Sequence, residues 1–138
     1  GQVLIQTYQV QHPVIRFVMQ NDFRGFYNYE IQERKRFNYP PFCRLIELRL
    51  KMKSEADLEN LSVELTRELK RVFGSRVLGP VAPSVARIRN YYIRTILLKI
   101  EKSLADHKVK EMISKVTDRF LSHEEHRALI IHIDVDPA

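Results

Sequence analysis

The sequence contains one cysteine, no tryptophan and four glycines, and it has no apolar run long enough to span a membrane. Because Cys43 stands alone, an internal disulfide and a cysteine-rich zinc site are both excluded, and a reducing, cytoplasmic setting fits best. A membrane-spanning helix needs roughly 20 apolar residues. The N-terminus lacks the charged-then-apolar order of a signal peptide. We therefore expect a soluble protein without a targeting segment.

The chain also lacks the motifs of an independent catalyst. Its four glycines do not form a phosphate-binding loop, and no Ser/His/Asp or Cys/His arrangement has a supporting context. At 138 residues with 44% hydrophobic content, the chain can form one ordinary domain with an appendage. We expect a binding or accessory protein rather than an enzyme.

Acidic residues are missing from one long stretch. The formal net charge is +6, and no Asp or Glu occurs between Glu68 and Glu101. Seven cations lie in that interval: Lys70, Arg71, Arg76, Arg87, Arg89, Arg94 and Lys99. Such a distribution favours a polyanionic partner, although a net charge of this size also occurs in proteins that bind nothing acidic.

The first third of the sequence predicts a strand and two helices. Residues 2–8 are expected to form a short strand, and His12-Pro13 to begin a first helix. Asp22 is a suitable cap for a second helix through Arg36, with contact residues Phe23, Phe26, Tyr27, Tyr29 and Ile31. The sequence Asn-Tyr-Pro-Pro at 38–41 then ends the helix and predicts a rigid joint.

The remaining sequence repeats one pattern twice. Residues 45–52 alternate like a strand with one buried face, and Ser54 begins an amphipathic helix that ends at Gly74. Residues 96–100 predict a second strand, followed by a helix capped by Ser103. The apolar stripe of that helix is Val109, Met112, Ile113, Val116 and Phe120. Further strands are expected at 77–78 and 128–136, the latter with Leu129, Ile131, Ile133 and Val135 on its buried side.

Two successive β-α-β units predict an α+β fold, in which a four-stranded antiparallel sheet carries both helices on one face. This is the split β-α-β, or ferredoxin-like, arrangement. An open sheet with another strand order is compatible with the same pattern. The expected organisation is therefore 1–41 as a leading segment and 42–138 as the α+β domain.

Two groups of potential metal ligands have simpler explanations. His132, Asp134 and Asp136 share one side of the last strand, where a divalent cation would need a further ligand, so they are expected to form its solvated face. The sequence SHEEH at 122–126 has its histidines three apart rather than the four that a zinc helix requires, and predicts a solvated loop. We expect no metal site in this chain.

The basic stretch holds the best candidates for nucleic-acid binding. Arg87 and Arg89 are expected in a loop held by two prolines, next to Tyr92 and Arg94. Cations beside aromatic rings suit phosphate contact and base stacking. A solvated loop whose tyrosines cap the core explains the composition equally well. A second cluster, Arg34, Lys35 and Arg36, either contacts phosphates or is the solvated end of a helix. The expected open face of the sheet lacks the aromatic residues with which RNA-recognition motifs stack bases.

Three stretches together resemble one family. They are GQVLIQTYQVQHPVI (1–15), ERKRFNYPPF (33–42), and VLGPVAP (77–83) with the closing IDVDP (133–137). In order and spacing they resemble the C-terminal end of the primosomal protein N-prime family, the PriA-type replication-restart DNA helicases of bacteria. The Tyr-Arg-aromatic-Gln sequence frequent in that family is replaced here by Tyr92-Ile93-Arg94-Thr95, so only Tyr92 matches.

The resemblance implies that the chain is part of a larger helicase. In that family two RecA-like lobes hydrolyse ATP with Mg and drive 3′-to-5′ unwinding, and a cysteine-rich insertion binds zinc. Residues 1–41 would be the end of the second lobe with its connecting helices. Residues 42–138 would be a domain resembling a small-subunit ribosomal protein. The chain alone would have no ATPase activity.

Two functions are therefore expected from the sequence. The first is a DNA-binding accessory domain for forked or single-stranded DNA, in which Arg34, Lys35, Arg36, Arg87, Arg89, Tyr92 and Arg94 make the contacts. The alternative is a protein-interaction module that docks on the helicase lobes or on single-stranded-DNA-binding protein, with other primosome proteins as further partners.

Overall fold

The computed structural model describes residues 1–137 and divides the chain into two compact units, Gly1–Phe37 and the residues from Asn38 onward. The first contains α1 (Pro13–Met19) and α2 (Phe23–Arg36).

The first unit forms its helices through local capping. Asp22 caps α2 as expected, because its Oδ1 accepts a hydrogen bond from the Gly25 N–H at 2.8 Å. Neither helix contains a buried residue. The expected strand at 2–8 is wrong, because these residues have no strand hydrogen bonds in this structure. A single extended segment has no neighbouring strand to accept its backbone groups.

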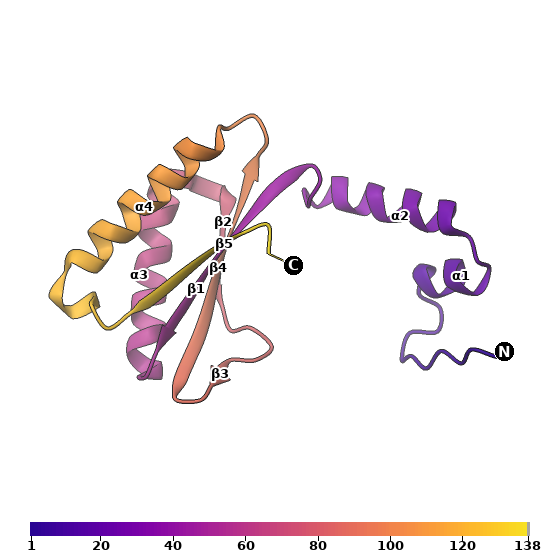
Figure 1. Cartoon of the computed structure of the whole chain (residues 1–138), viewed down its shortest axis with the longest axis horizontal. Coiled ribbons are helices and arrows are strands. Elements are labelled where there is room, and N and C mark those ends of the chain that lie inside the picture. Colours follow the sequence, from indigo (N-terminus) through magenta and orange to yellow (C-terminus); the bar gives the residue numbers. More distant parts are fainter. Residues whose placement is uncertain (138) are drawn as a thin grey trace. The chain divides into compact units, whose positions relative to one another are not determined.

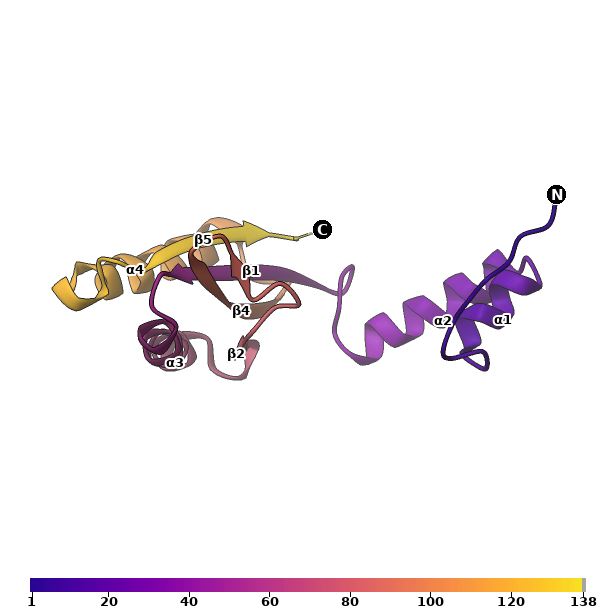
Figure 2. The ribbon, with the colours of Figure 1, turned by 90° about the horizontal axis from the view of Figure 1, so that it is seen from below.

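The second unit is an antiparallel sheet with two long helices. The strands lie in the order β2-β4-β1-β5, and the short β3 pairs with β4. The elements are β1 (Cys43–Met52), α3 (Glu55–Phe73), a 3₁₀ turn (Gly74–Arg76), β2 (Val77–Val81), β3 (Arg87–Ile88), β4 (Tyr91–Glu101), α4 (Asp106–Ser122), a 3₁₀ turn (Glu124–His126) and β5 (Ile130–Val135). Figure 2 shows this strand order from β5 to β2. The α+β prediction is confirmed, with β3 as an additional strand.

The two long helices lie on the same side of the strands (Figure 1). Alternate residues of β1 and β4 point into this layer and are completely buried, among them Leu48, Leu50 and Leu98. They pack in one core with Leu58, Leu65 and Leu69 of α3 and with Val109, Ile113, Val116 and Phe120 of α4. Burying each large aliphatic side chain contributes about 1.5–3 kcal/mol, so this layer holds the second unit together.

The two helix starts differ in a way the repeat did not predict. Ser54 caps α3, since its Oγ accepts a hydrogen bond from the Asp57 N–H at 3.3 Å. The expected cap at Ser103 is wrong, because α4 begins after Ala105 and no side chain caps it. The extra residue in the second copy is absorbed by a turn in which the Leu104 N–H donates to the Glu101 carbonyl. Met112 was expected in the apolar stripe of α4 and is exposed.

The strand β2 approaches the backbone of β4 closely at Gly79. Gly79 has φ of 103°, and a Cβ at this position would lie 2.8 Å from the Thr95 carbonyl oxygen of β4. The register with β4 shifts between Leu78 and Val81. A side chain at Gly79 would therefore both strain the backbone and collide with the neighbouring strand.

The last strand is only partly covered by the helices. Leu129 is buried and Ile131 packs against the core, but Ile133 and Val135 are exposed at 43% and 37%. The expectation that all four form a buried face is therefore wrong for the last two. Ile133 pairs with Leu48 and Val135 with Ile46 at the edge of the sheet, where no further strand among residues 1–137 continues the layer.

Candidate nucleic-acid interface

The predicted basic loop is folded as a β-hairpin. Arg87 pairs with Tyr92 and Ile88 with Tyr91, so β3 continues the sheet outward from β4. Arg89 and Asn90 form the turn, and Arg89 adopts a left-handed backbone with φ of 54°. The expectation of a loop is therefore wrong for Arg87, which lies in a strand, whereas Arg89 lies in the connecting turn. Pairing with Tyr92 of β4 fixes the position of Arg87 on the sheet.

Arg87 and Tyr92 face each other across this hairpin. The Arg87 guanidinium lies 4.9 Å from the centre of the Tyr92 ring, within the range of a cation–π contact. Its Nε also donates a hydrogen bond to the Arg89 carbonyl at 3.3 Å. Tyr92 in turn packs against the hydrophobic core. The tyrosine thus holds Arg87 in place, and a base could stack on the ring only by displacing that arginine.

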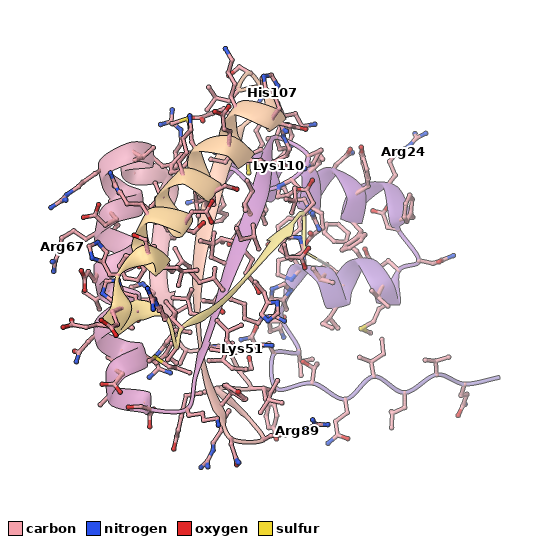
Figure 3. All side chains as sticks on the ribbon, turned by 60° about the vertical axis from the view of Figure 1, so that its left-hand side comes forward. Arg24, Lys51, Arg67, Arg89, His107 and Lys110 are labelled. Carbon is pink, nitrogen blue, oxygen red and sulfur yellow. The ribbon has the colours of Figure 1, made fainter. Side chains whose placement is uncertain are left out.

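Arg89 lies exposed at the turn of the hairpin. Its guanidinium makes no hydrogen bond or ion pair with any of residues 1–137 that the structure describes, and the side chain is exposed. Figure 3 shows it projecting at the end of the hairpin. All of its N–H donors are available to a phosphate oxygen, which suits the planar guanidinium.

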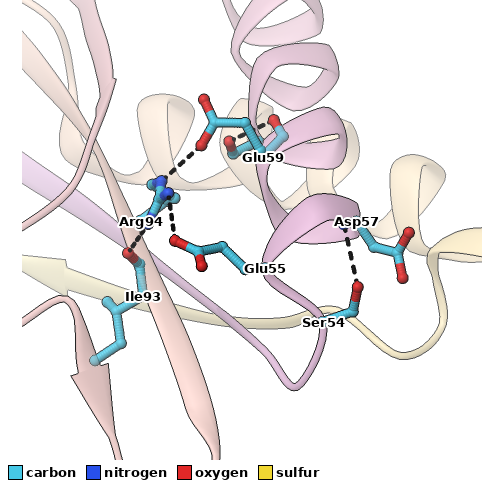
Figure 4. Close-up of polar contacts among 7 residues, drawn as sticks. Ser54, Glu55, Asp57, Glu59, Ile93 and Arg94 are labelled. Atoms are coloured by element: carbon cyan, nitrogen blue, oxygen red, sulfur yellow. Dashed lines mark hydrogen bonds and ion pairs between the residues drawn. The ribbon is translucent and has the colours of Figure 1, made fainter.

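Arg94 is already bound within the protein (Figure 4). Its Nε donates to Glu59 Oε2 at 2.8 Å, and its Nη2 lies 3.4 Å from Glu55 Oε1. Its Nη1 donates to the Ile93 carbonyl at 3.0 Å. The hydrogen bond that Arg94 donates to Glu59 raises the pKa of Arg94, and the side chain is only 13% exposed. Arg94 thus connects the base of the hairpin to the first turns of α3, and phosphate contact would require this network to open.

Two lysines that the sequence did not single out lie beside the hairpin. Met52 of β1 pairs with Tyr92, so Lys51 and Lys53 lie at the same end of the sheet as the hairpin. Figure 3 shows Lys51 on the side of the molecule where Arg89 projects. The alternation of β1 predicted only that Lys51 is solvated. Lys51 lies next to the hairpin only because of the register between β1 and β4. A local sequence pattern does not indicate that register.

The predicted cluster Arg34, Lys35 and Arg36 forms the last turn of α2 in the other unit. Arg34 lies 3.6 Å from Glu30, and Arg36 lies 3.8 Å from Glu33. Cations in the last turn also interact favourably with the helix dipole. These positions suit a solvated helix end, and they leave Lys35 exposed.

The potential metal ligands are not assembled into a site. Among residues 1–137, no group of three or more His, Cys, Asp or Glu side chains is arranged to hold a metal ion. Asp136 Oδ1 accepts a hydrogen bond from the Leu45 N–H. His126 is buried, its Nδ1 lies 2.8 Å from the Phe120 carbonyl oxygen, and its ring stacks on Phe120. The expectation of a solvated loop is thus wrong for His126, which closes the core after α4.

The described residues also contain no helix that is both long enough and apolar enough to cross a membrane.

The fold and its exposed cations define a small α+β domain with a basic hairpin at one end of its sheet. Residues 35–138 match the family described as "Primosomal protein N C-terminal domain". The chain belongs to this family.

Relatives extend the match over nearly the whole chain. "Replication restart protein PriA" of Thermotoga maritima is 36% identical over 73% of this chain. The proteins of the same name from Synechocystis sp. and Bacillus subtilis are 31% and 26% identical over 99% of it. The chain spans only 13%, 16% and 17% of the lengths of these three relatives. It thus corresponds to a C-terminal portion of much longer replication restart proteins.

Proposed function

We propose that this chain is the C-terminal DNA-binding accessory domain of an ATP-dependent 3′-to-5′ DNA helicase that restarts stalled replication forks. The observation that carries the proposal is the hairpin of β3 and β4, which projects Arg87 and Arg89 from a rigid sheet. Membership in a family of replication restart proteins supports DNA as the polyanion that these cations meet.

Each predicted residue has a distinct part in this proposal. Arg89 contacts a phosphate directly, and Arg87 contacts the adjacent phosphate while Tyr92 supports it from below. Lys51 and Lys53 extend the cationic surface along the end of the sheet. Arg94 positions the hairpin through Glu55 and Glu59 rather than contacting DNA. The cluster Arg34, Lys35 and Arg36 supplies additional phosphate contacts from α2.

We further propose that residues 42–138 have the split β-α-β, ferredoxin-like plan, which the strand order β2-β4-β1-β5 supports. Residues 1–41 would be the end of the second RecA-like lobe with its connecting helices. Because the chain spans so little of its relatives' length, ATP, Mg and Zn would be bound by the remainder of a longer protein. Single-stranded-DNA-binding protein and other primosome proteins would be its partners.

The test is a titration of fluorescently labelled forked and single-stranded DNA at two salt concentrations. Affinity that depends on phosphate contacts falls steeply with salt. The double variant Arg87→Glu/Arg89→Glu is expected to weaken binding roughly tenfold or more and to lower the slope of log K against log salt by about 2. The matched control is Arg67→Glu/Lys70→Glu, which makes the same charge change on two exposed residues of α3. Figure 3 shows Arg67 away from the hairpin. This control should lose little.

Binding that is absent, insensitive to salt, or weakened equally by both double variants would contradict the proposal. An acidic peptide that binds the wild-type chain when DNA does not, and that is lost with Arg87→Glu/Arg89→Glu, would favour the alternative. In that case the hairpin would dock an acidic tail such as that of single-stranded-DNA-binding protein.

A further inference from the structure

An open cavity of about 510 Å³ lies beside the turn between α4 and β5. Its wall is formed by Glu64 of α3 and by His123, Glu124, Glu125 and His126 of the turn. Figure 1 shows this turn at the end of α4. Three carboxylates thus line the cavity, and none of residues 1–137 adds a lysine or arginine to its wall. Such a surface attracts cations and repels phosphates, so it does not extend the basic surface proposed for DNA.

His126 is the buried member of this wall. Its side chain is only 9% exposed, and its ring stacks on Phe120 with the ring centres 4.1 Å apart. Its Nδ1 lies 2.8 Å from the Phe120 carbonyl oxygen, which can only accept, so Nδ1 carries the proton of the neutral ring. The lone pair is then on Nε2. This atom lies 3.7 Å from Glu64 Oε2, which is beyond hydrogen-bond distance.

The Nε2 of His126 faces the cavity without a donor. Among residues 1–137, no fully buried side-chain nitrogen or oxygen of a buried or half-buried residue lacks a hydrogen-bond partner. The Nε2 has no such partner in the described chain, so it is not enclosed in the core and can be reached from the cavity. The neutral imidazole nitrogen and the Glu64 carboxylate are both acceptors, and neither can satisfy the other. A cation with several N–H donors would satisfy both.

The nearest arginines of the same helices are engaged by another glutamate. Glu68, one turn further along α3, accepts hydrogen bonds from Arg71 Nη1 at 2.6 Å and from Arg119 Nη2 at 3.1 Å. Glu64 forms no ion pair with a lysine or arginine of residues 1–137. Glu68 thus shows how a carboxylate on α3 holds guanidinium groups, and Glu64 offers the same group to an outside ligand.

We propose that this cavity binds the guanidinium group of an arginine side chain presented by a partner protein. One N–H of the guanidinium donates to His126 Nε2 and another to the Glu64 carboxylate, while Glu124 and Glu125 supply further negative charge. A guanidinium carries five N–H donors in a rigid planar fork, so it can satisfy two separate acceptors at once. The ammonium of lysine is a more strongly hydrated point charge and fits this pair of acceptors less well.

The imidazole makes this binding sensitive to pH. In acid the Nε2 of His126 gains a proton, donates to Glu64 instead of accepting, and repels the guanidinium. The charged and titratable groups around the ring are Glu64 and Glu68 from α3, Arg119 from α4, and His123, Glu124 and Glu125 from the turn. Arg119 is held by Glu68, and protonation of His123 adds to the repulsion. Arginine binding should therefore weaken as the pH is lowered.

The test titrates the 138-residue chain with the peptide acetyl-Gly-Arg-Gly-amide and follows the imidazole nitrogens by NMR. The Nε2 signal of His126 should move as the peptide binds, with a dissociation constant on the order of 1 mM. Glu64→Gln keeps the shape of the side chain and removes its charge, and should weaken binding about fivefold or more. The matched control is Asp118→Asn, the same change on an exposed residue of α4 that does not line the cavity. This control should bind like the wild type.

Two altered peptides and a change of pH test the chemistry of the ligand. Citrulline in place of arginine keeps the shape without the charge and should abolish binding. Lysine in place of arginine should bind about threefold more weakly or worse. Lowering the pH from about 8 to about 5.5 should weaken binding of the arginine peptide to the wild type about fivefold or more. Glu64→Gln should leave the affinity for forked DNA unchanged, so this proposal and the DNA proposal succeed or fail separately.

Several outcomes overturn the proposal. The first is an arginine peptide that leaves the His126 signals unmoved. Equal weakening by Glu64→Gln and Asp118→Asn, or a lysine peptide that binds as tightly as the arginine peptide, would also refute it. Zn²⁺ that moves the Nε2 signal when the arginine peptide does not would identify a metal site in place of an arginine site.

Discussion

The two units of the chain differ in how much apolar surface they bury by themselves. Unit 2, from Asn38 onward, closes one core between its sheet and two helices, and Leu48, Leu50 and Leu98 are completely inaccessible there. Unit 1, Gly1–Phe37, has two capped helices without a buried residue. In this unit Phe23 is 76% exposed.

This difference shows that the local signals that start a helix do not by themselves stabilise a tertiary fold. Asp22 and Ser54 cap their helices in the same way, with Gly25 and Asp57 as the donors. Caps specify where a helix begins and contribute about 1 kcal/mol, whereas burial provides most of the stability of a domain. We infer that unit 2 folds cooperatively on its own interactions and that unit 1 contributes little to the measured free energy of unfolding.

The largest expected effect tests this contrast directly. Leu48→Ala removes a side chain that is completely buried between the sheet and the helices, and should lower the free energy of unfolding by about 2–5 kcal/mol. Phe23→Ala in α2 removes a larger but exposed side chain, and should change it by less than about 0.5 kcal/mol. Urea unfolding followed by circular dichroism measures both. A comparable loss from Phe23→Ala would mean that unit 1 has a core of its own.

An intermediate effect is expected from the ion pairs. Arg94→Ala removes three hydrogen bonds from a mostly buried guanidinium, although its glutamate partners are partly exposed, and should cost about 1–2 kcal/mol. Arg36→Ala removes an exposed ion pair with Glu33 and an exposed contact with the Phe37 ring, and should cost about 0–0.5 kcal/mol. The same urea titration compares the two. Equal costs would show that Arg94 has no special role at the base of the hairpin.

The smallest effect concerns pH. A hydrogen bond from Arg76 lowers the pKa of Glu101, and the two atoms Nε and Oε2 lie 2.6 Å apart. Because the pKa is lowered in the folded state, this pair stabilises the protein above the usual carboxyl pKa, and the contribution is lost as pH falls through the lowered value. Glu101→Gln should flatten the dependence of unfolding free energy on pH in the acidic range. Glu33→Gln in unit 1 is the control, and an equal change there would contradict this assignment.

Much of the core was predictable from local pattern. Periodicity alone located β1 and α3, because each of them buries one face in a single apolar layer. The signals were the alternation of residues 45–52 and the apolar stripe that follows Ser54. The antiparallel sheet followed from the repeated unit. In these segments the spacing of the buried residues follows from the geometry of the helix or strand to which they belong.

Features that depend on pairing between distant residues were not predictable. Arg87 and Tyr92 become neighbours only because β3 folds back on β4, and the sequence between them has no apolar alternation that would indicate a strand. Lys51 joins the basic hairpin through the register of β1. Ile133 alternates correctly, yet it is exposed on β5, an edge strand whose outer side pairs with no other strand of the described residues. The alternation of apolar residues identifies the face of a strand that could be buried. It does not show whether another helix or strand covers that face.

The single cysteine gives the chain an internal reporter of its own motions. Cys43 is almost completely buried at the start of β1, its Sγ donates to the Asn38 carbonyl oxygen at 2.9 Å, and burial raises the pKa of its thiol. Since the thiolate is the form that reacts, an alkylating reagent can modify this residue only when the segment from Asn38 to Cys43 opens. The rate of alkylation by a thiol reagent would therefore report how often the entrance to the sheet opens, with no label added to the protein.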